Sequence, residues 1–449
     1  MGAARGEFSS RLGFVLAAAG SAVGLGNIWG FPTQAASNGG AAFLVVYLLL
    51  AFCLAFPALM AELVIGRHAK ANAVTALSGI ANGPLTRRLG AGTGFLGILT
   101  ASLILSFYAI VAGWMIAYAL AALADIAGAA RASLWLTGFS VERNLAFTGL
   151  FMVLTIAIIC GGVRDGIEKW CTRLMPALLV MLLLLIVYVL TLDGAADGVR
   201  AYLVPDFSRV TDPALVLSAM GQAFFSMSLG VGTMLIYGSY VSDRENLVAL
   251  GRSVTLFDIG IAVMAGMLII PAMFVAQANG VAIYDEAGAL IAEDTLIFTV
   301  LPDLFDSMGG PGLVVALVFF VLMSVAALTS SISMLEVPVA YAVENHGAGR
   351  RRATFLIGGT IALVSVVLIF NFGTLFGLAV AIATRYSQPL LGLLMCVFAG
   401  WIWHRNSLLG EIRKGHPDGE GGLFWRIWPG YVRFVCPAAI LAIFVQQLR

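Results

Sequence analysis

The sequence predicts an all-α membrane protein, and both its composition and its apolar segments indicate this class. Of the 449 residues, 60% are hydrophobic and 11% are charged, and the mean hydropathy is +0.98. Soluble globular domains carry about 25% charged residues. The composition therefore excludes a cytoplasmic enzyme and a disordered chain. The formal net charge of +1 gives no sign of a polyanionic partner, and we expect no nucleic acid.

Eleven apolar segments are candidates for membrane-spanning helices, each of which needs about 20 mostly apolar residues. We expect them to form one transmembrane domain over residues 1–449. The segments are 12–34, 41–66, 90–124, 146–161, 172–192, 213–240, 254–278, 312–341, 353–371, 374–403 and 431–448. No small-residue cleavage site precedes the second segment, so we expect the first to remain as a helix and not to be removed as a signal peptide.

The distribution of basic residues predicts the orientation. Most of the 25 Lys and Arg residues fall in segments that face the cytoplasm if the N-terminus is inside. The 278–311 segment has six acids and no Lys or Arg, which is typical of an outer loop. With eleven spans, the C-terminus is then expected outside.

Two segments are interrupted by glycine and small polar residues. Gly20–Pro32 reads GSAVGLGNIWGFP and Gln222–Gly232 reads QAFFSMSLGVG. Each glycine weakens a helix by about 1 kcal/mol relative to alanine. Non-helical backbone at membrane depth is tolerated only where it is buried in protein or lines a cavity. The alternative for the first segment is small-xxx-small helix packing through Gly20 and Gly24.

The interruptions fall at matching places in two halves. Residues 12–192 and 213–403 each hold five spans, and since five is odd, the second half is inverted. Paired interrupted helices in inverted halves point to a transporter binding site. We therefore predict a 5+5 inverted-repeat transporter fold with discontinuous helices 1 and 6, and with residues 431–448 as an eleventh transmembrane helix.

Interrupted helices offer backbone groups to ligands. Unpaired carbonyl oxygens can replace the water shell of Na+, and N–H groups at half-helix N-termini suit a carboxylate. Asp258 is the only acid of the seventh span, where a charge is costly, so it is expected to have a partner or to snorkel to the inner interface. Thr329, Ser330 and Ser331 lie mid-span and need partners, or they bond their own helix carbonyls.

Three stretches resemble one family. Arg11–Gly40, Gln222–Tyr240 and Ala326–Glu336 closely resemble the neurotransmitter:sodium symporters, the solute carrier 6 type. The eleven-helix form is similar to prokaryotic members such as the bacterial leucine and multi-hydrophobic amino-acid transporters. The resemblance implies a multi-pass protein of the bacterial inner membrane that is a monomer or weak dimer.

The resemblance implies two sodium sites and no chloride requirement. Chloride-dependent relatives have asparagine where this chain has Asp258 and serine where it has Ala262. The first site would use Ala22, Asn27, Ser226 and Asp258. The second would use Gly20, Val23, Ala326, Thr329 and Ser330.

The resemblance also implies a substrate pocket. Leu25, Gly26 and the Tyr108 hydroxyl would hold a carboxylate, although Tyr108 is also compatible with a simple interhelical hydrogen bond. The amine would meet Ser21, Ala22, Phe225 and Ser228. Ile104, Phe225, Val231, Ser330 and Met334 would shape the side-chain pocket. Relatives that carry monoamines have aspartate where this chain has Ser21, so a neutral, hydrophobic amino acid is expected.

The gates follow the family only in part. On the inner side, Arg5, Phe8, Ser239, Tyr240 and Glu344 match residues that hold the N-terminal segment over the exit path. On the outer side, Gly30 replaces the gate arginine and the tenth span has no acid. Arg385 of that span is expected to take part of the gate role or to contact the substrate; the alternative is that it caps carbonyls beside Pro389. Glu62 is expected to bond the unwound part of helix 6, and Glu336 receives no role.

These expectations combine into one function. We expect a sodium-coupled symporter, not an enzyme, that imports its substrate by alternating access. The alternatives are a symporter for another small zwitterion or for an organic acid that contacts Arg385, and a non-transporting ligand sensor on the same scaffold. An intramembrane hydrolase is disfavoured because the chain has no GxSxG or HExxH motif.

Overall fold

The computed structural model describes residues 6–283, 290, 298, 300–415 and 423–447. Nine helices in these ranges are long and apolar enough to cross a membrane, and one bent pair passes the same test as a single span. The nine are Ala41–Ala69, Pro84–Ile126, Val141–Cys160, Val163–Val189, Leu247–Ala278, Gly310–His346, Arg350–Phe370, Phe372–Ile402 and Phe424–Gln446. This confirms the all-α membrane class.

Helix 1 is discontinuous. Its first half is α1 (Arg11–Ala22), which Ser10 caps by accepting a hydrogen bond from the Gly13 N–H. Regular helix stops at Val23, where φ/ψ is −73°/106°, and resumes as a π-helical turn (Gly26–Gly30) that continues into α2 (Phe31–Ser37). The two halves are bent by 59°. The break lies where the glycine-rich sequence predicts it.

Helix 6 is also discontinuous. Its halves are α11 (Pro213–Ser226) and α12 (Thr233–Ser239), separated by residues 227–232. Ser228, Gly230 and Gly232 take positive φ angles of 51°, 82° and 84°. Such angles are incompatible with right-handed helix, so the chain cannot continue α11 through them. Neither half alone is long enough to span a membrane.

Several helix ends differ from the sequence expectation. The third span, α6 (Pro84–Ile126), begins six residues before the expected 90 and is 43 residues long. The fifth span begins at Val163, not 172, and the last begins at Phe424, not 431. The added turns are more polar than the apolar segments, so hydropathy alone places the ends too far inside. The outer-loop acids at 285, 286, 293 and 294 lie outside the described residues.

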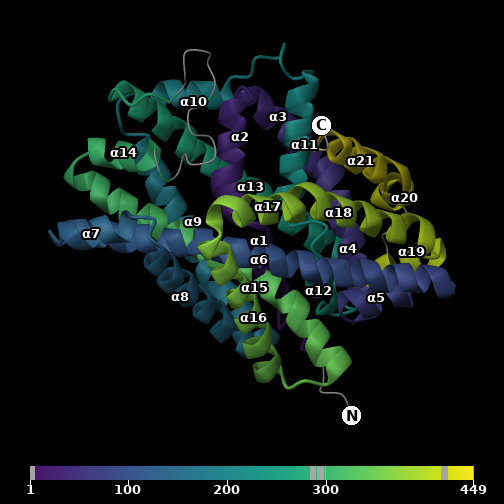
Figure 1. The fold of residues 1–449 in the computed structure, drawn as a ribbon. Coiled ribbons are helices and arrows are strands. Elements are labelled where there is room, and N and C mark those ends of the chain that lie inside the picture. Colours follow the sequence, from purple (N-terminus) through teal and green to yellow (C-terminus); the bar gives the residue numbers. More distant parts are fainter. Residues whose placement is uncertain (1–5, 284–289, 291–297, 299, 416–422, 448–449) are drawn as a thin grey trace.

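The remaining helices complete the bundle. They are α3 (Ala41–Leu50), α4 (Phe56–Ala69), α5 (Ala73–Gly79), α7 (Ala130–Thr137), α8 (Val141–Cys160), α9 (Lys169–Val189), α10 (Ala195–Leu203), α13 (Leu247–Ala278), α14 (Val300–Ser307), α15 (Gly310–His346), α16 (Arg350–Phe370), α17 (Gly377–Val380), α18 (Gln388–Val397), α19 (Arg405–Arg413), α20 (Leu423–Gly430) and α21 (Cys436–Gln447). Figure 1 shows α6 crossing the middle of the molecule.

The two interrupted helices contact each other and share α15 as a neighbour. α1 packs against α13, α15 and α9, and α12 packs against α4, α15 and α1. α6 packs along α15. The breaks are therefore surrounded by α13, α15 and α6, which carry the polar residues described next.

Candidate functional site

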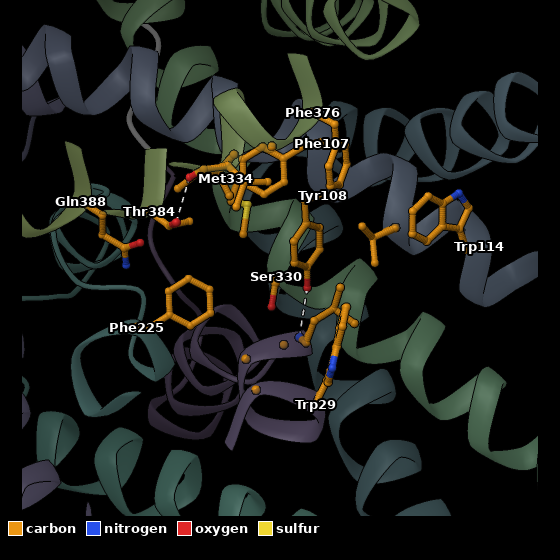
Figure 2. Close-up of a pocket in the computed structure, with 18 of the residues that line it drawn as sticks. Trp29, Phe107, Tyr108, Trp114, Phe225, Ser330, Met334, Phe376, Thr384 and Gln388 are labelled. Carbon is orange, nitrogen blue, oxygen red and sulfur yellow. Dashed lines mark hydrogen bonds between the residues drawn. The ribbon is translucent and has the colours of Figure 1, made fainter. Parts of the chain in front are cut away.

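A large cavity opens beside the two breaks. Its volume is about 960 Å³, and most of its wall is aromatic or aliphatic. Figure 2 shows Tyr108 and Ser330 in the middle of the cavity, Phe225 and Gln388 toward one end, and Trp29 and Trp114 toward the other. Of the expected substrate residues, those that line it are Ala22, Leu25, Gly26, Ile104, Tyr108, Phe225, Ser228, Val231, Ser330 and Met334.

Tyr108 connects the cavity wall to the broken part of helix 1. The Leu25 N–H donates to the Tyr108 hydroxyl over 3.4 Å. A Cβ added at Gly24 would lie 2.9 Å from that hydroxyl and 2.6 Å from Ser330 Oγ, so only glycine fits between them. The hydroxyl thus lies at the unwound backbone, where a carboxylate could replace the Leu25 contact. Phe225, the expected partner in the lid, is 42% exposed.

Ser21 differs from its expected use. Its hydroxyl donates to Ser333 Oγ over 2.7 Å, and the residue is fully buried and does not line the cavity. Its carbonyl oxygen instead accepts a hydrogen bond of 3.0 Å from the Ser228 hydroxyl. Ser21 therefore connects the breaks of helices 1 and 6 through its backbone.

Of the four residues expected for the first sodium site, Asn27, Ser226 and Asp258 form one buried polar cluster, and Ala22 lines the cavity. Asn27 Nδ2 donates to Ser226 Oγ over 2.8 Å and to Asp258 Oδ1 over 2.7 Å, and Ser226 Oγ donates to Asp258 Oδ2 over 2.8 Å. The Tyr47 hydroxyl donates to Ser226 Oγ over 3.4 Å. Asp258 is fully buried, which excludes the alternative that it snorkels to an interface. Hydroxyl, amide and carboxylate oxygens are the ligand types that hard cations take.

The residues expected for the second sodium site also lie together. Ser330 Oγ lies 3.3 Å from the Gly20 carbonyl oxygen and 3.0 Å from that of Val23, both exposed by the end of α1. Thr329 Oγ1 lies 3.0 Å from the Ala326 carbonyl oxygen. A Cβ on Gly20 would lie 3.1 Å from Thr329 Cβ, so α1 and α15 touch here. Thr329 and Ser331 do bond their own helix, but Ser330 reaches across to helix 1.

The described residues that line the cavity form no ion pair with one another, so the expected outer gate has none among them. Gly30 and Arg385 both line the cavity, and Arg385 is exposed within a π-helical turn. The described part of the chain gives Arg385 no hydrogen bond, which argues against the carbonyl-capping alternative. Gln222 Nε2 donates to the Gly26 carbonyl over 2.8 Å and so holds the two interrupted helices together.

The described start of the N-terminal segment packs against the end of helix 6, where the sequence predicts the inner gate. The Phe8 N–H donates to the Tyr240 carbonyl over 3.2 Å, and the Phe8 ring packs edge-on against Phe14, Tyr237 and Tyr240. Ser239 Oγ donates to the Ile236 carbonyl over 2.5 Å. Arg5 lies outside the described residues.

Glu344 binds the loop between α4 and α5. Its carboxylate accepts hydrogen bonds from the Asn72 N–H over 2.7 Å and from Asn72 Nδ2 over 2.9 Å. Asn72 also caps α5 by accepting from Val74 and Thr75 N–H groups. Glu344 therefore holds the α4–α5 connection, a contact that was not expected from the sequence.

Comparison with known proteins identifies the family. The model of the sodium:neurotransmitter symporter family matches residues 5–144 and 136–449 of this chain. The chain belongs to the sodium:neurotransmitter symporter family. It is therefore a sodium-dependent membrane transporter and not an enzyme.

Individual relatives agree with this membership. An uncharacterised sodium-dependent transporter of Bacillus subtilis (strain 168), YhdH, is 34% identical over 98% of this chain and 97% of the relative. The sodium- and chloride-dependent taurine transporter of Bos taurus is 26% identical over 82% of this chain and 67% of the relative. The crystal structure of MhsT in complex with L-phenylalanine matches with a TM-score of 0.82 and 36% identity, over 99% of this chain and all of that chain.

In this sodium:neurotransmitter symporter, Glu336 has a clear partner. The carboxylate is fully buried in α15 and forms an ion pair with Arg350, at 2.5 Å to Nη2 and 3.1 Å to Nη1. The Tyr240 hydroxyl donates to the same carboxylate over 2.6 Å. Sequence reasoning assigned Glu336 no role. The sequence does contain a signal for this pair. A buried acid in a long apolar segment is costly unless a cation pairs with it, and Arg350 begins the next helix.

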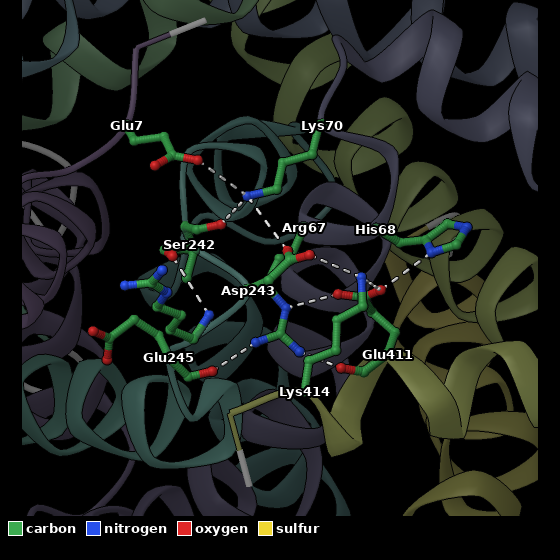
Figure 3. Close-up of polar contacts among 11 residues, drawn as sticks. Glu7, Arg67, His68, Lys70, Ser242, Asp243, Glu245, Glu411 and Lys414 are labelled. Carbon is green, nitrogen blue, oxygen red and sulfur yellow. Dashed lines mark hydrogen bonds and ion pairs between the residues drawn. The ribbon is translucent and has the colours of Figure 1, made fainter.

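A second unexpected cluster lies at the C-terminal end of α4. Arg67 Nε and Glu411 Oε1 form a 2.8 Å ion pair, and both side chains are almost completely buried. Figure 3 shows His68 and Lys414 beside the same carboxylate. His68 Nδ1 lies 3.2 Å and Lys414 Nζ 2.9 Å from Glu411 Oε2. Burial opposes ionisation of Glu411, but hydrogen bonds from His68 and Lys414 and the charge of Arg67 outweigh it and lower its pKa to about 2.

The backbone of the break in helix 6 is hydrogen-bonded to an acid of α4. The Gly230 N–H donates to Glu62 Oε1 over 2.7 Å, and Glu62 is 1% exposed. This is the contact expected for Glu62. An N–H left free by the break would otherwise be an unpaired donor inside the membrane.

Proposed function

We propose that the protein is a sodium-coupled symporter that imports a neutral, hydrophobic amino acid by alternating access. The observation that carries the proposal is the meeting of an apolar cavity with the unwound backbone of helix 1 at Tyr108 and Leu25. An amino-acid substrate needs a polar site for its charged backbone and an apolar space for its side chain. MhsT, which has been crystallised with L-phenylalanine, supports this substrate class.

Two sodium ions bind in this proposal. The first lies among Asn27, Ser226 and Asp258, with the substrate carboxylate and Ala22 completing its shell. The second lies among the Gly20, Val23 and Ala326 carbonyls and the Thr329 and Ser330 hydroxyls. Asp258 supplies a fixed negative charge beside the first site, so chloride is not required.

The driving force comes from the ion gradient. The protein lies in the bacterial inner membrane with its N-terminus inside. Outside Na+ and substrate bind in the cavity, Tyr108 and Phe225 close over them, and the Phe8 segment then leaves the inner end. Each charge that crosses 100 mV supplies about 2.3 kcal/mol. The exposed Phe225 and the packed Phe8 support a starting state that is open to one side only.

A thermal-shift screen tests the proposal. The purified protein is heated with each of the common amino acids in NaCl and, as the matched control, in KCl. A ligand that binds only the folded state raises the unfolding temperature as its concentration exceeds the Kd. We expect hydrophobic amino acids to stabilise the protein in NaCl only. Equal stabilisation in KCl, or none by any amino acid, would contradict the proposal.

A second candidate is a symporter for an organic acid or another zwitterion that contacts Arg385. The observation that favours it is the exposure of this cation on the cavity wall. Uptake kinetics of Arg385→Ala and Arg385→Lys separate the two. Unchanged KM and turnover in both variants would remove Arg385 from substrate binding.

A further inference from the structure

Gln388 presents an unused amide to the cavity. The residue begins α18, lines the cavity and is 7% exposed. Its Oε1 is buried and has no hydrogen-bond partner, and the described part of the chain provides none for Nε2 either. Buried amides are normally paired, because an unpaired one loses its water without compensation. A group with this cost at the wall of a binding cavity is a candidate for contact with a ligand.

The backbone around Gln388 is held in place by the break of helix 6. Gly230 has a φ of 82°, and a Cβ there would overlap the Gln388 carbonyl oxygen and lie 2.8 Å from the Gly392 nitrogen. The tenth span thus docks closely on the residue that precedes Val231, one of the side-chain pocket residues. Figure 2 shows Gln388 toward the Phe225 end of the cavity, away from Trp29 and Trp114.

The polar residues next to Gln388 differ from it in their hydrogen-bonding groups. The Thr384 hydroxyl, one turn earlier, donates to the Val380 carbonyl over 2.8 Å and is satisfied by its own helix. Arg385 is a cation and can only donate hydrogen bonds. The Thr384 oxygen can still accept, so what distinguishes Gln388 is an amide oxygen that has no hydrogen-bond partner in the described part of the chain. Exchanging the oxygen and the nitrogen of the amide would move the acceptor to the present position of Nε2, and the side chain would still carry one acceptor oxygen.

We propose that Gln388 is a specificity residue that accepts a hydrogen bond from a donor at the end of the substrate side chain. Phe225, Val231 and Met334, which also line the cavity, offer apolar contacts to the rest of such a side chain. A flat apolar side chain with one N–H or O–H fits both features, which describes tryptophan and tyrosine. The inference rests on the proposed amino-acid substrate and narrows it to aromatic amino acids that carry a donor.

Binding of two matched ligand pairs tests the inference. In NaCl, we expect the protein to bind L-tyrosine more tightly than L-phenylalanine, and L-tryptophan more tightly than 1-methyl-L-tryptophan, by about tenfold. Gln388→Met, which keeps the length but removes the acceptor, should abolish both differences. Gln388→Glu keeps acceptor oxygens and should retain both preferences. Thr384→Val is the control on the same face and should change neither.

The outcomes separate this inference from the proposed function. Sodium-dependent binding of all four ligands with equal affinity would overturn the role of Gln388 and leave the symporter proposal standing. The same holds if Gln388→Met weakens all four ligands alike, because the residue would then only support the fold of the site. Absence of sodium-dependent binding by every ligand, phenylalanine included, would overturn both.

Discussion

The Ser330 side chain of α15 bonds the broken end of α1. Its hydroxyl lies near both the Gly20 and Val23 carbonyls, and a cation between these oxygens would lose one ligand in Ser330→Ala. We expect the midpoint of Na+-dependent stabilisation to rise about tenfold. Ser324→Ala is the matched control, because Ser324 donates to the Phe320 carbonyl of its own helix. An unchanged Na+ midpoint in Ser330→Ala would remove the hydroxyl from the second site.

Glu411 gives a prediction that depends on pH. Its folded pKa of about 2 lies below its ordinary value of 4.5, so its ionised form stabilises the fold above about pH 4.5, and this is lost as the pH falls toward 2. Glu411→Gln leaves the buried Arg67 without its acid, so we expect a loss of about 3–5 kcal/mol at pH 7.

Differential scanning fluorimetry from pH 7 to pH 2 checks this. The difference in unfolding temperature between wild type and Glu411→Gln should shrink as the pH falls through the window between about 4.5 and 2. A difference that stays constant over that window would mean that the carboxylate charge does not stabilise the fold.

At the residue scale, the sequence predicts groups whose chemistry is unusual for their surroundings. Asp258 stands out as an acid in an apolar segment, the family resemblance adds Asn27 and Ser226 to it, and the three side chains meet in one cluster. Their assignment as sodium ligands remains a proposal. The Arg67–Glu411 pair could not be predicted, because 344 residues separate its partners and each lies near the end of its own helix, where a charged residue is ordinary. The bond between Ser21 and Ser333 depends equally on how α1 packs on α15.

At the element scale, the break of helix 6 rests on glycines that no other residue can replace. Gly230→Ala adds a Cβ at a positive φ, which costs about 1–2 kcal/mol, and the Cβ would also overlap the Gln388 carbonyl. We expect a lower unfolding temperature and loss of transport.

Gly221→Ala is the matched control for this change. Gly221 lies within α11, and a Cβ there meets no atom within 4 Å. Alanine favours helix over glycine by about 1 kcal/mol, so this variant should be neutral or stabilised in the same measurement. If both variants behave alike, the shape of the break does not constrain helix 6.

The existence of the elements was more predictable than their ends. The two breaks follow from local runs of glycine and small polar residues, and both were found where the sequence places them. The early starts at Pro84 and Val163 were missed because hydropathy does not register the polar turns that extend a helix beyond its apolar segment. The long contact of α6 with α15 also has no local signal, since it depends on the packing of the whole bundle.

At the scale of the whole molecule, the proposed cation sites join residues of four helices. Asn27 and Gly20 belong to helix 1, Ser226 to helix 6, Asp258 to α13 and Ser330 to α15. A cation in each site would hold these helices in one arrangement, and by linkage the substrate that shares the first site would bind more tightly with Na+ present. The boundaries 12–192 and 213–403 of the two inverted halves remain a prediction.

Uptake into proteoliposomes tests the central claim, that Na+ binding at the two breaks drives amino-acid transport. Radiolabelled L-phenylalanine or L-tyrosine is supplied outside vesicles under an inward Na+ gradient, an inward K+ gradient, or equal Na+ on both sides. The account predicts transient accumulation above the external concentration only under the inward Na+ gradient. Accumulation of the same size in K+, or with no Na+ gradient, would contradict it.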